Sequence, residues 1–214
     1  MLPHTLNTNV ERYYLQGIEG FLKAEVYISR LSDGTQVVCK DYSRFRQNPI
    51  AAFIARYLVK REHKALLRLQ DWPHAPKTFT SEEPLILLQE YVAGKTIEQF
   101  KVVDPQVVKN VRTALRQLHL KGIIHNDVRA SNVIIKADNS AVLIDFTSAG
   151  TLPKFMPRTA RWLMLQDVRH AVKFKKKTGE SLIARELRIL QKPKWLQWTQ
   201  NVWKKKILVL LKGN

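Results

Sequence analysis

Three polar side chains interrupt an apolar stretch in the middle of the chain. The segment GIIHNDVRASNVII, residues 122–135, carries His125, Asp127 and Asn132 among isoleucines and valines. Polar groups near a core are costly unless they are paired or used, so these residues are candidates for a functional site. A further aspartate, Asp145, ends the next apolar run, AVLID.

The segments around these residues predict a hairpin that gathers them. The short apolar strands VII and VLI are joined through Asp138-Asn139-Ser140, a turn sequence. Their pairing brings Asn132 near Asp145, with Asp127 close by. Carboxylate and amide oxygens suit Mg²⁺, which also keeps waters and takes substrate phosphates. A carboxylate that the metal does not need can orient an attacking hydroxyl.

The N-terminal half predicts a β-hairpin and then a long helix. VYISRL, from Val26, and QVVCKDY, from Gln36, flank the turn sequence Ser32-Asp33-Gly34-Thr35. Asn48-Pro49 is typical of a helix start, and the expected inward row at steps of four is Ile50, Ile54, Leu58, position 62, Leu66 and then Leu69.

Position 62 of this inward row is a glutamate, and an inward carboxylate requires a cation. Lys40, on the second strand of the hairpin, is the nearest candidate upstream. The alternative is that the helix is rotated and Glu62 faces solvent. Further along, residues 84–94 predict a buried strand ending in a turn, and Pro105 to Leu120 predict a helix with inward Val107, Val108, Val111, Leu115 and Leu118.

The composition predicts a folded, strongly basic protein. The chain has 214 residues, 45% of them hydrophobic, and 36 Lys and Arg against 18 Asp and Glu give a net charge of +18. This excess suggests an anionic partner, namely nucleic acid, acidic lipid or a phosphorylated substrate, although a solvated basic surface would have the same charge.

Cys39 is the only cysteine, so no intrachain disulfide forms, which fits a reducing compartment. The first residues do not resemble a signal peptide and the run ILVLL is too short to span a bilayer, so we expect a cytoplasmic protein or one bound peripherally to the inner membrane face.

These residues, in this order, resemble the protein-kinase-like superfamily, with its motifs H-R-D-x-x-x-x-N and D-F-G. The corresponding residues are His125-Asn126-Asp127 with Asn132, Asp145-Phe146-Thr147, the strand lysine in Val37-Val38-Cys39-Lys40, and the helix glutamate Glu62. The resemblance covers roughly residues 16–167. It implies an α+β fold of two lobes: a nucleotide-binding N-lobe (1–92) with a small antiparallel β-sheet, a reduced and mainly helical C-lobe (93–190), and a basic C-terminal helix (191–214).

The resemblance also implies ATP and Mg²⁺ as cofactors. Lys40 would hold the nucleotide phosphates and would be positioned by Glu62, while Asn132 and Asp145 would hold Mg²⁺. The segment QGIEGFLKAEVYI lacks the pattern G-x-G-x-x-G, so Gly20 and Lys23 are expected to contribute to a weaker phosphate-covering loop.

In the same comparison Asp127 would orient the acceptor hydroxyl and accept its proton. Arg129 could stabilise charge on the transferring phosphoryl group. The alternative is a surface cation paired to an acidic neighbour. His125 is expected to orient the loop rather than act as a base.

The compact C-terminal half is similar to two atypical branches. LKAEVYI and the turn Ile144-Asp145-Phe146-Thr147-Ser148 resemble the RIO and Bud32 type of protein kinase. The segments 161–169 and 61–66 resemble bacterial lipopolysaccharide kinases, which act on heptose or Kdo sugars.

The C-terminal tail suggests one of two environments. Trp195, Trp198 and Val202 fall at helical spacing, and lysines as far as Lys212 surround an apolar cluster. This pattern fits a helix lying on anionic lipid, and equally a helix packed on the C-lobe. The basic cluster Lys173, Lys175, Lys176 and Lys177 could serve lipid, nucleic acid or neither.

The interpretation favoured by the sequence is an ATP- and Mg²⁺-dependent phosphotransferase whose acceptor is a hydroxyl of a lipopolysaccharide-core sugar. A small RIO-like protein serine/threonine kinase is the alternative enzyme. An alternative of another class is a non-catalytic module on a kinase fold that binds membrane or nucleic acid, with nucleic acid less favoured. The presence of every catalytic polar residue speaks against this third hypothesis.

Overall fold

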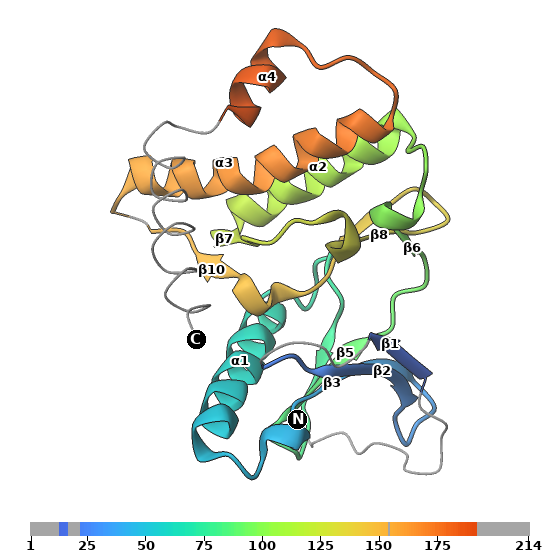
Figure 1. The fold of residues 1–214 in the computed structure, drawn as a ribbon, viewed down its shortest axis with the longest axis vertical. Coiled ribbons are helices and arrows are strands. Elements are labelled where there is room, and N and C mark those ends of the chain that lie inside the picture. The colour runs from blue at the N-terminus through green and yellow to red at the C-terminus, as the bar shows by residue number, and fades with distance from the viewer. Residues whose placement is uncertain (1–12, 17–21, 154, 192–214) are drawn as a thin grey trace, which may run out of the picture.

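The computed structural model describes residues 13–16, 22–153 and 155–191, and they form two lobes. In Figure 1 an antiparallel sheet and helix α1 (Pro49–Leu67) make up the lower lobe. Helices α2 (Pro105–Leu120) and α3 (Pro157–Phe174) lie side by side in the upper lobe, with α4 (Ala184–Leu190) above them. The sheet has the order β1-β2-β3-β5-β4, and its strands are β1 (Tyr13–Gln16), β2 (Glu25–Arg30), β3 (Gln36–Asp41), β4 (Thr78–Phe79) and β5 (Ile86–Glu90).

The two faces of strand β3 have different environments. The predicted hairpin is confirmed, since β2 pairs with β3 from Glu25↔Asp41 to Arg30↔Gln36. Cys39, opposite Leu88 of β5, is fully buried in a small cluster with Tyr27. Lys40, opposite Leu87, points to the other face, where Leu87 packs on α1. The alternation of a β-strand therefore directs Lys40 toward the helix.

Helix α1 begins where the sequence predicts but buries a different row. Asn48 Oδ1 accepts a hydrogen bond from the Ala51 N–H at 3.0 Å, and Pro49 occupies the first turn. The predicted row is wrong at its first member, because Ile50 is 75% exposed while Ala55 is fully buried. Ile54 and Leu58 of that row are half-buried. A helix turns about 100° per residue, so Ala55 lies about 20° from Glu62 around the axis and Ile50 about 120°. A row read in strict steps of four drifts away from the inward face.

The upper lobe is built around helix α2. Asp104 Oδ1 accepts from the Gln106 N–H at 2.7 Å and caps the helix. The predicted bounds and inward valines and leucines of α2 are confirmed, and these side chains belong to the largest buried cluster of the described residues. Ala171 and Phe174 of α3 pack into the same cluster.

Short strands in the upper lobe position the central loop. Strand β8 (Val133–Ile135) pairs with β9 (Ala141–Leu143), which confirms the second predicted hairpin. Strand β6 (Lys95–Thr96) adds to β8, and β7 (Ile123–Ile124) pairs with β10 (Gly150–Thr151). The residues between β7 and β8 and those after β9 are thereby held next to each other.

The chain passes from the sheet to the upper lobe between β5 and β6. Gly94 lies in this connection with φ +156°, and a Cβ there would lie 2.5 Å from the carbonyl oxygen of Ile135. Only glycine fits such an approach of two backbones.

Some predictions fall outside the part of the chain that the structure describes. The C-terminal helix predicted over 191–214 lies almost entirely in residues 192–214, and the boundaries at 92 and 190 remain predictions. Within the described ranges no helix is long and apolar enough to cross a membrane.

Candidate active site

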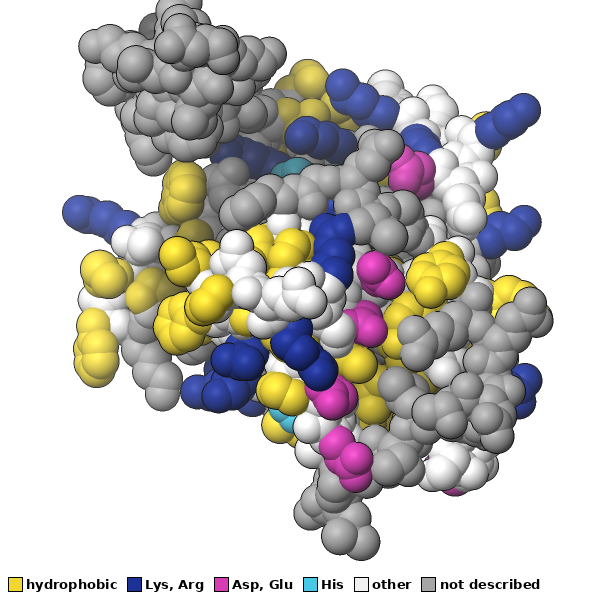
Figure 2. All heavy atoms as spheres, turned by 60° about the horizontal axis from the view of Figure 1, so that its bottom comes forward, with side chains coloured by type: hydrophobic (Ala, Val, Ile, Leu, Met, Phe, Trp, Pro, Cys, Tyr) yellow, Lys and Arg dark blue, Asp and Glu magenta, His cyan; other side chains and the backbone are white. Residues whose placement is uncertain are grey.

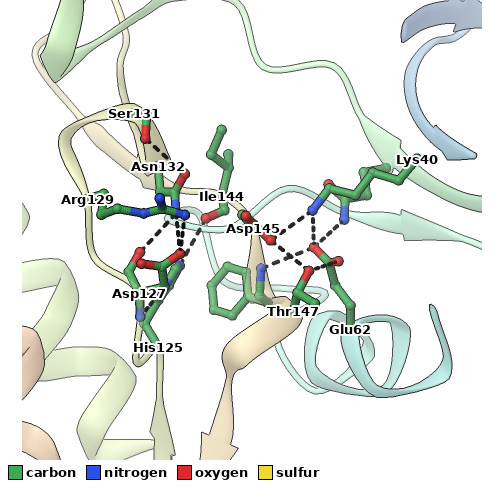
Figure 3. A network of polar contacts seen from close by, with 12 residues as sticks. Lys40, Glu62, His125, Asp127, Arg129, Ser131, Asn132, Ile144, Asp145 and Thr147 are labelled. Carbon is green, nitrogen blue, oxygen red and sulfur yellow. Dashed lines mark hydrogen bonds and ion pairs between the residues drawn. The ribbon is translucent and has the colours of Figure 1, made fainter. Parts of the chain in front are cut away.

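Lys40 connects two carboxylates that lie between the lobes. Its Nζ atom is 2.7 Å from Glu62 Oε1 and 3.1 Å from Asp145 Oδ1 (Figure 3). The Glu62 side chain is 2% exposed, so the predicted inward orientation is confirmed and the rotated-helix alternative is wrong. Strand β3, helix α1 and the segment after β9 each contribute one member of this cluster.

The Glu62 carboxylate is bonded by four donors from separate parts of the fold. Besides Lys40, its Oε1 atom accepts from Gln89 Nε2 at 2.9 Å and from the Phe146 N–H at 3.1 Å. Its Oε2 atom accepts from Thr147 Oγ1 at 2.7 Å. A buried carboxylate with this many donors is fixed in position.

The charges in this cluster shift the pKa values of Lys40 and Asp145. Burial alone would lower the pKa of Lys40, but Glu62 and then Asp145 outweigh burial and raise it above its ordinary value. Burial alone would raise the pKa of Asp145, but the Lys40 ammonium and the Thr147 hydroxyl lower it to about 2. At neutral pH the site therefore holds an ammonium between two carboxylates.

Asp145 has an unusual backbone conformation. Its φ is +64°, in the left-handed region, and a short 3₁₀ turn (146–148) follows. Phe146 in this turn is fully buried, with its ring 4.6 Å from that of His125. The turn also places Thr147 Oγ1 2.7 Å from Asp145 Oδ1. Since a hydroxyl has one proton, Thr147 donates to Asp145 or to Glu62 at any moment.

Asp127 and Asn132 form a second group beside the first (Figure 3). Asn132 Nδ2 donates to the Asp127 carbonyl at 2.9 Å and to Asp127 Oδ2 at 3.2 Å. The Asn132 carbonyl accepts from the Ile144 N–H at 2.9 Å, which joins this group to Asp145 along the backbone. The Asn132 Oδ1 atom accepts from Ser131 Oγ at 3.3 Å (Figure 3). An amide oxygen has a second lone pair, so this atom can still bind a metal.

Arg129 bonds to Asp127 itself. Its Nη2 atom is 2.6 Å from Asp127 Oδ2, and its side chain is 60% exposed. The sequence allowed Arg129 to be a surface cation paired to an acidic neighbour, and the structure has such a pairing with Asp127. An exposed pair of this kind is weak, so Arg129 can turn to another anion at small cost.

His125 orients the loop that carries Asp127. It is fully buried, its Nδ1 atom accepts from the Asp127 N–H at 3.3 Å, and its Nε2 atom lies 3.0 Å from the Ile144 carbonyl. These partners require a neutral ring with the proton on Nε2. Burial lowers the pKa of His125, which agrees with that state.

Asp167 on α3 holds the backbone of the same loop, and sequence reasoning did not assign it a role in the site. Its Oδ2 atom accepts from the His125 N–H at 2.9 Å and contacts His119 Nε2 at 2.9 Å, while Oδ1 accepts from the Asn126 N–H at 2.8 Å. The side chain is 1% exposed. The signal that identified Glu62, a carboxylate on the inward face of an amphipathic helix, applies to Asp167 as well.

The other predicted site residues are not in these groups. Lys23 is exposed two residues before β2, and Gly20 lies outside the described residues. In the predicted basic cluster, Lys175 pairs with Glu186, and Lys177 Nζ donates to the carbonyls of residues 97, 98 and 100. At least these two lysines are used within the fold.

The donor set fits Mg²⁺. Asp145 offers a partly exposed carboxylate and Asn132 an amide oxygen, both hard ligands. No three His, Cys, Asp or Glu side chains come together as a metal site among the described residues. Mg²⁺ does not need such a cluster when waters and substrate phosphates complete its coordination.

Comparisons with known proteins identify relatives of this chain. A family model described as the RIO domain matches residues 25–187. The serine/threonine-protein kinase D of Synechocystis sp. is 33% identical over 73 residues, which cover 32% of this chain and 14% of the relative. The cysteine-rich receptor-like protein kinase 10 of Arabidopsis thaliana is 29% identical over 142 residues, which cover 58% of this chain and 20% of the relative.

Solved structures of similar fold include the Rio2 kinase of Chaetomium thermophilum. Its ADP/Mg²⁺-phosphoaspartate complex superposes with a TM-score of 0.63 at 16% identity, covering 80% of this chain and 57% of the other. A second structure of that kinase has the same TM-score and identity and is covered to 59%. This chain spans a fifth or less of the two curated relatives and under two thirds of these structures. The likeness confirms the two-lobed protein-kinase-like fold that the motifs predicted.

Proposed function

Because this chain belongs to the RIO domain family, we propose that it transfers the γ-phosphoryl group of ATP to a hydroxyl of a protein. The observation that carries the proposal is the placement of Lys40, Glu62 and Asp145 beside Asp127 and Asn132. A fixed cation, two metal-ligating oxygens and a separate carboxylate are the parts that phosphoryl transfer requires.

The nucleotide side of the site is assigned to Lys40 and its partners. Lys40 would bind phosphate oxygens as a charged ammonium, and Glu62 would keep it in position. Asn132 and Asp145 would hold Mg²⁺, which neutralises charge on the phosphates when bound. Gly20 and Lys23 remain proposed contributors to the loop over the phosphates.

The acceptor side is assigned to Asp127. Both of its described side-chain bonds, from Arg129 and Asn132, fall on Oδ2, and we propose Oδ1 as the oxygen that receives the hydroxyl proton. Arg129 would leave Asp127 for the transferring phosphoryl group, where a cation stabilises developing charge.

The choice of a protein acceptor rests on the family match. That match supports the RIO branch of the two that the sequence resembles, and it gives no support to a lipopolysaccharide-core sugar. The sugar acceptor and the membrane contact of the tail remain predictions from the sequence. The tail itself lies outside the described residues.

The proposal is tested with γ-labelled ATP and Mg²⁺, offering casein, a deacylated inner-core saccharide and whole lipopolysaccharide in parallel. We expect label on casein, with a rate about 10²–10⁴-fold lower in Asp127→Asn because general-base catalysis contributes that much. Nucleotide affinity should be retained in that variant. Label on the saccharide would overturn the protein acceptor, and unchanged turnover in Asp127→Asn would overturn the assignment of the base.

Two further outcomes separate the alternatives. ATP binding without label on any acceptor would favour the non-catalytic module. Since one similar structure is named as a phosphoaspartate complex, label retained on the chain itself is treated with hydroxylamine, which cleaves acyl phosphates. Loss of that label would place the phosphoryl group on a carboxylate instead of a hydroxyl.

A further inference from the structure

A pocket of about 380 Å³ lies outside the Lys40 network, between α1 and the strands β7 and β10. One side is formed by Tyr57, Arg61 and Lys64 of α1 and by Arg68, which caps the C-terminal end of this helix. Residues spaced four, three and four apart lie on one face of a helix, so these side chains converge on the same space. The volume is in the range of small-molecule sites.

The charge in this pocket has one sign. Arg61, Lys64 and Arg68 line it, and no carboxylate is among its described lining residues. None of the ion pairs among the described residues involves these three cations. Lys64 and Arg68 are exposed, so their charges are available to a ligand.

The sequence of α1 makes this charge unfavourable for the helix itself. Arg56, Lys60, Lys64 and Arg68 follow one another at intervals of four, and like charges at that spacing repel. An anion bound at the last two members would relieve the repulsion. The net charge alone does not locate such an anion, because Figure 2 shows Lys and Arg in several separate groups on one face.

The opposite wall adds a hydroxyl and apolar surface. Arg68 Nη1 is 3.1 Å from Thr151 Oγ1, which places this hydroxyl beside the cations. Ala65 and Ile123 contribute apolar lining to the pocket. Tyr57 also lines it and is 59% exposed, so its ring can stack on a ligand. Cations next to an aromatic and aliphatic wall fit an anion that is attached to an apolar or ring-shaped body.

The pocket also adjoins the segment that follows Asp145. Arg61 Nε and Nη2 donate to the Ala149 carbonyl at 3.2 and 3.0 Å, and Nη2 donates to the Ser148 carbonyl at 3.1 Å. These bonds tie α1, which carries Glu62, to the turn after Asp145. A ligand across Lys64, Arg68 and Thr151 would strengthen the same connection.

We propose that this pocket binds a phosphate monoester of a small organic molecule. Lys64, Arg68 and the Nη1 edge of Arg61 contact the phosphate, together with the Thr151 hydroxyl, and the organic body lies against Tyr57 and Ile123. The site is separate from the proposed nucleotide site, and its occupancy does not require phosphoryl transfer.

The test is a titration of ¹⁵N-labelled protein with phenyl phosphate and, separately, inorganic phosphate, at constant ionic strength. We expect saturable shifts of the Gly150 and Thr151 amide signals, with phenyl phosphate the tighter ligand. Saturable shifts at Phe146 and Thr147 alone would place the anion at Lys40 and overturn the proposal. Absence of any saturable shift at Gly150 and Thr151 would also overturn it.

Matched variants identify the cations. Lys64→Gln/Arg68→Gln should weaken phenyl phosphate binding by about tenfold or more, because charge-assisted bonds to the anion are lost. Arg56→Gln/Lys60→Gln removes the same charge from the same helix outside the pocket. It should change the affinity by less than about twofold, because solvent-exposed charges that do not line the pocket contribute little. Equal losses in both variants would indicate non-specific attraction. If the double variant does not fold, Lys64→Gln alone is compared with Lys60→Gln.

The comparison of phenyl phosphate with inorganic phosphate tests whether the organic part of the ligand contributes to binding. Equal affinities for phenyl phosphate and inorganic phosphate would overturn the organic part of the proposal. Since the readout is binding at named amides, failure of the phosphotransferase assay leaves this test unaffected.

Discussion

Replacing Glu62 separates the role of its charge from the role of its shape. Glu62→Gln keeps an oxygen that can accept from Lys40, Gln89 and the Phe146 N–H, and the new amide can donate to Thr147 Oγ1. The loss is mainly one charge-assisted bond, so we expect a decrease of about 1–2 kcal/mol in the free energy of unfolding. Glu62→Ala removes both oxygens and every one of these bonds.

The loss of stability in Glu62→Ala follows from the hydrogen-bond donors that the variant leaves without an acceptor. Lys40 and Thr147 retain Asp145 as a partner, whereas Gln89 Nε2 and the Phe146 N–H lose theirs. Breaking a buried pair costs about 3–5 kcal/mol, and we expect about 4 kcal/mol here. That is a large part of the total stability of about 5–15 kcal/mol of an ordinary domain.

The measurement is urea unfolding at pH 7, followed by tryptophan fluorescence. Glu83→Gln is the control, because the Arg46–Glu83 pair is exposed on both sides and its loss should cost less than about 1 kcal/mol. A Glu62→Ala variant within about 1 kcal/mol of wild type would refute the reasoning, given the desolvation penalty for unpaired donors. Equal losses for the glutamine and alanine variants would show that the charge of Glu62, and not its hydrogen bonds, stabilises the site.

Three further outcomes are expected. The pKa of Asp145 is lowered to about 2 from an ordinary value of 3.8, so its contribution to the free energy of unfolding is present above 3.8 and is lost as the pH falls toward 2. Asp145→Asn should therefore flatten the loss of stability in acid unfolding, and it should weaken Mg²⁺-ATP binding. An unchanged acid-unfolding profile together with unchanged affinity would contradict both expectations. Asp167→Asn should lower the free energy of unfolding by about 1–3 kcal/mol, because the His125 loop loses a hydrogen-bond acceptor. It should also slow phosphoryl transfer while ATP affinity is retained. Urea unfolding measures the first effect and calorimetry the ATP affinity, and a wild-type transfer rate would argue against this role of Asp167. Gly94→Ala should destabilise by about 1–3 kcal/mol, since its Cβ would overlap the Ile135 backbone; a melting temperature equal to wild type would show that the connection can shift.

Local patterns made much of the fold predictable. The bounds of α2 follow from Asp104-Pro105 at its start and the apolar spacing up to Leu120. Both hairpins follow from turn residues between alternating or apolar runs. In α1 the same approach failed for Ile50, because alanines carry little hydrophobic signal although they form the buried face.

Long-range contacts were harder to predict. Glu62 could be assigned to Lys40 because a charge on an inward row is unusual, but Asp145 bonds the same ammonium from 105 positions away. The sequence analysis gave Thr147 no role in the site, although its hydroxyl contacts both carboxylates. The inward position of Asp167 on its helix could have marked it as a buried carboxylate, but its partners, the N–H groups of His125 and Asn126, could not be identified before the helix is placed in space.

The contact of Lys40 with two carboxylates has a consequence for ligand order. A divalent cation at Asp145 must compete with the ammonium already there, so metal alone is expected to bind poorly. Phosphates draw the ammonium away and free the carboxylate. Metal and nucleotide should therefore bind with positive cooperativity, and because coupling free energies are reciprocal, each should raise the affinity of the other by the same factor.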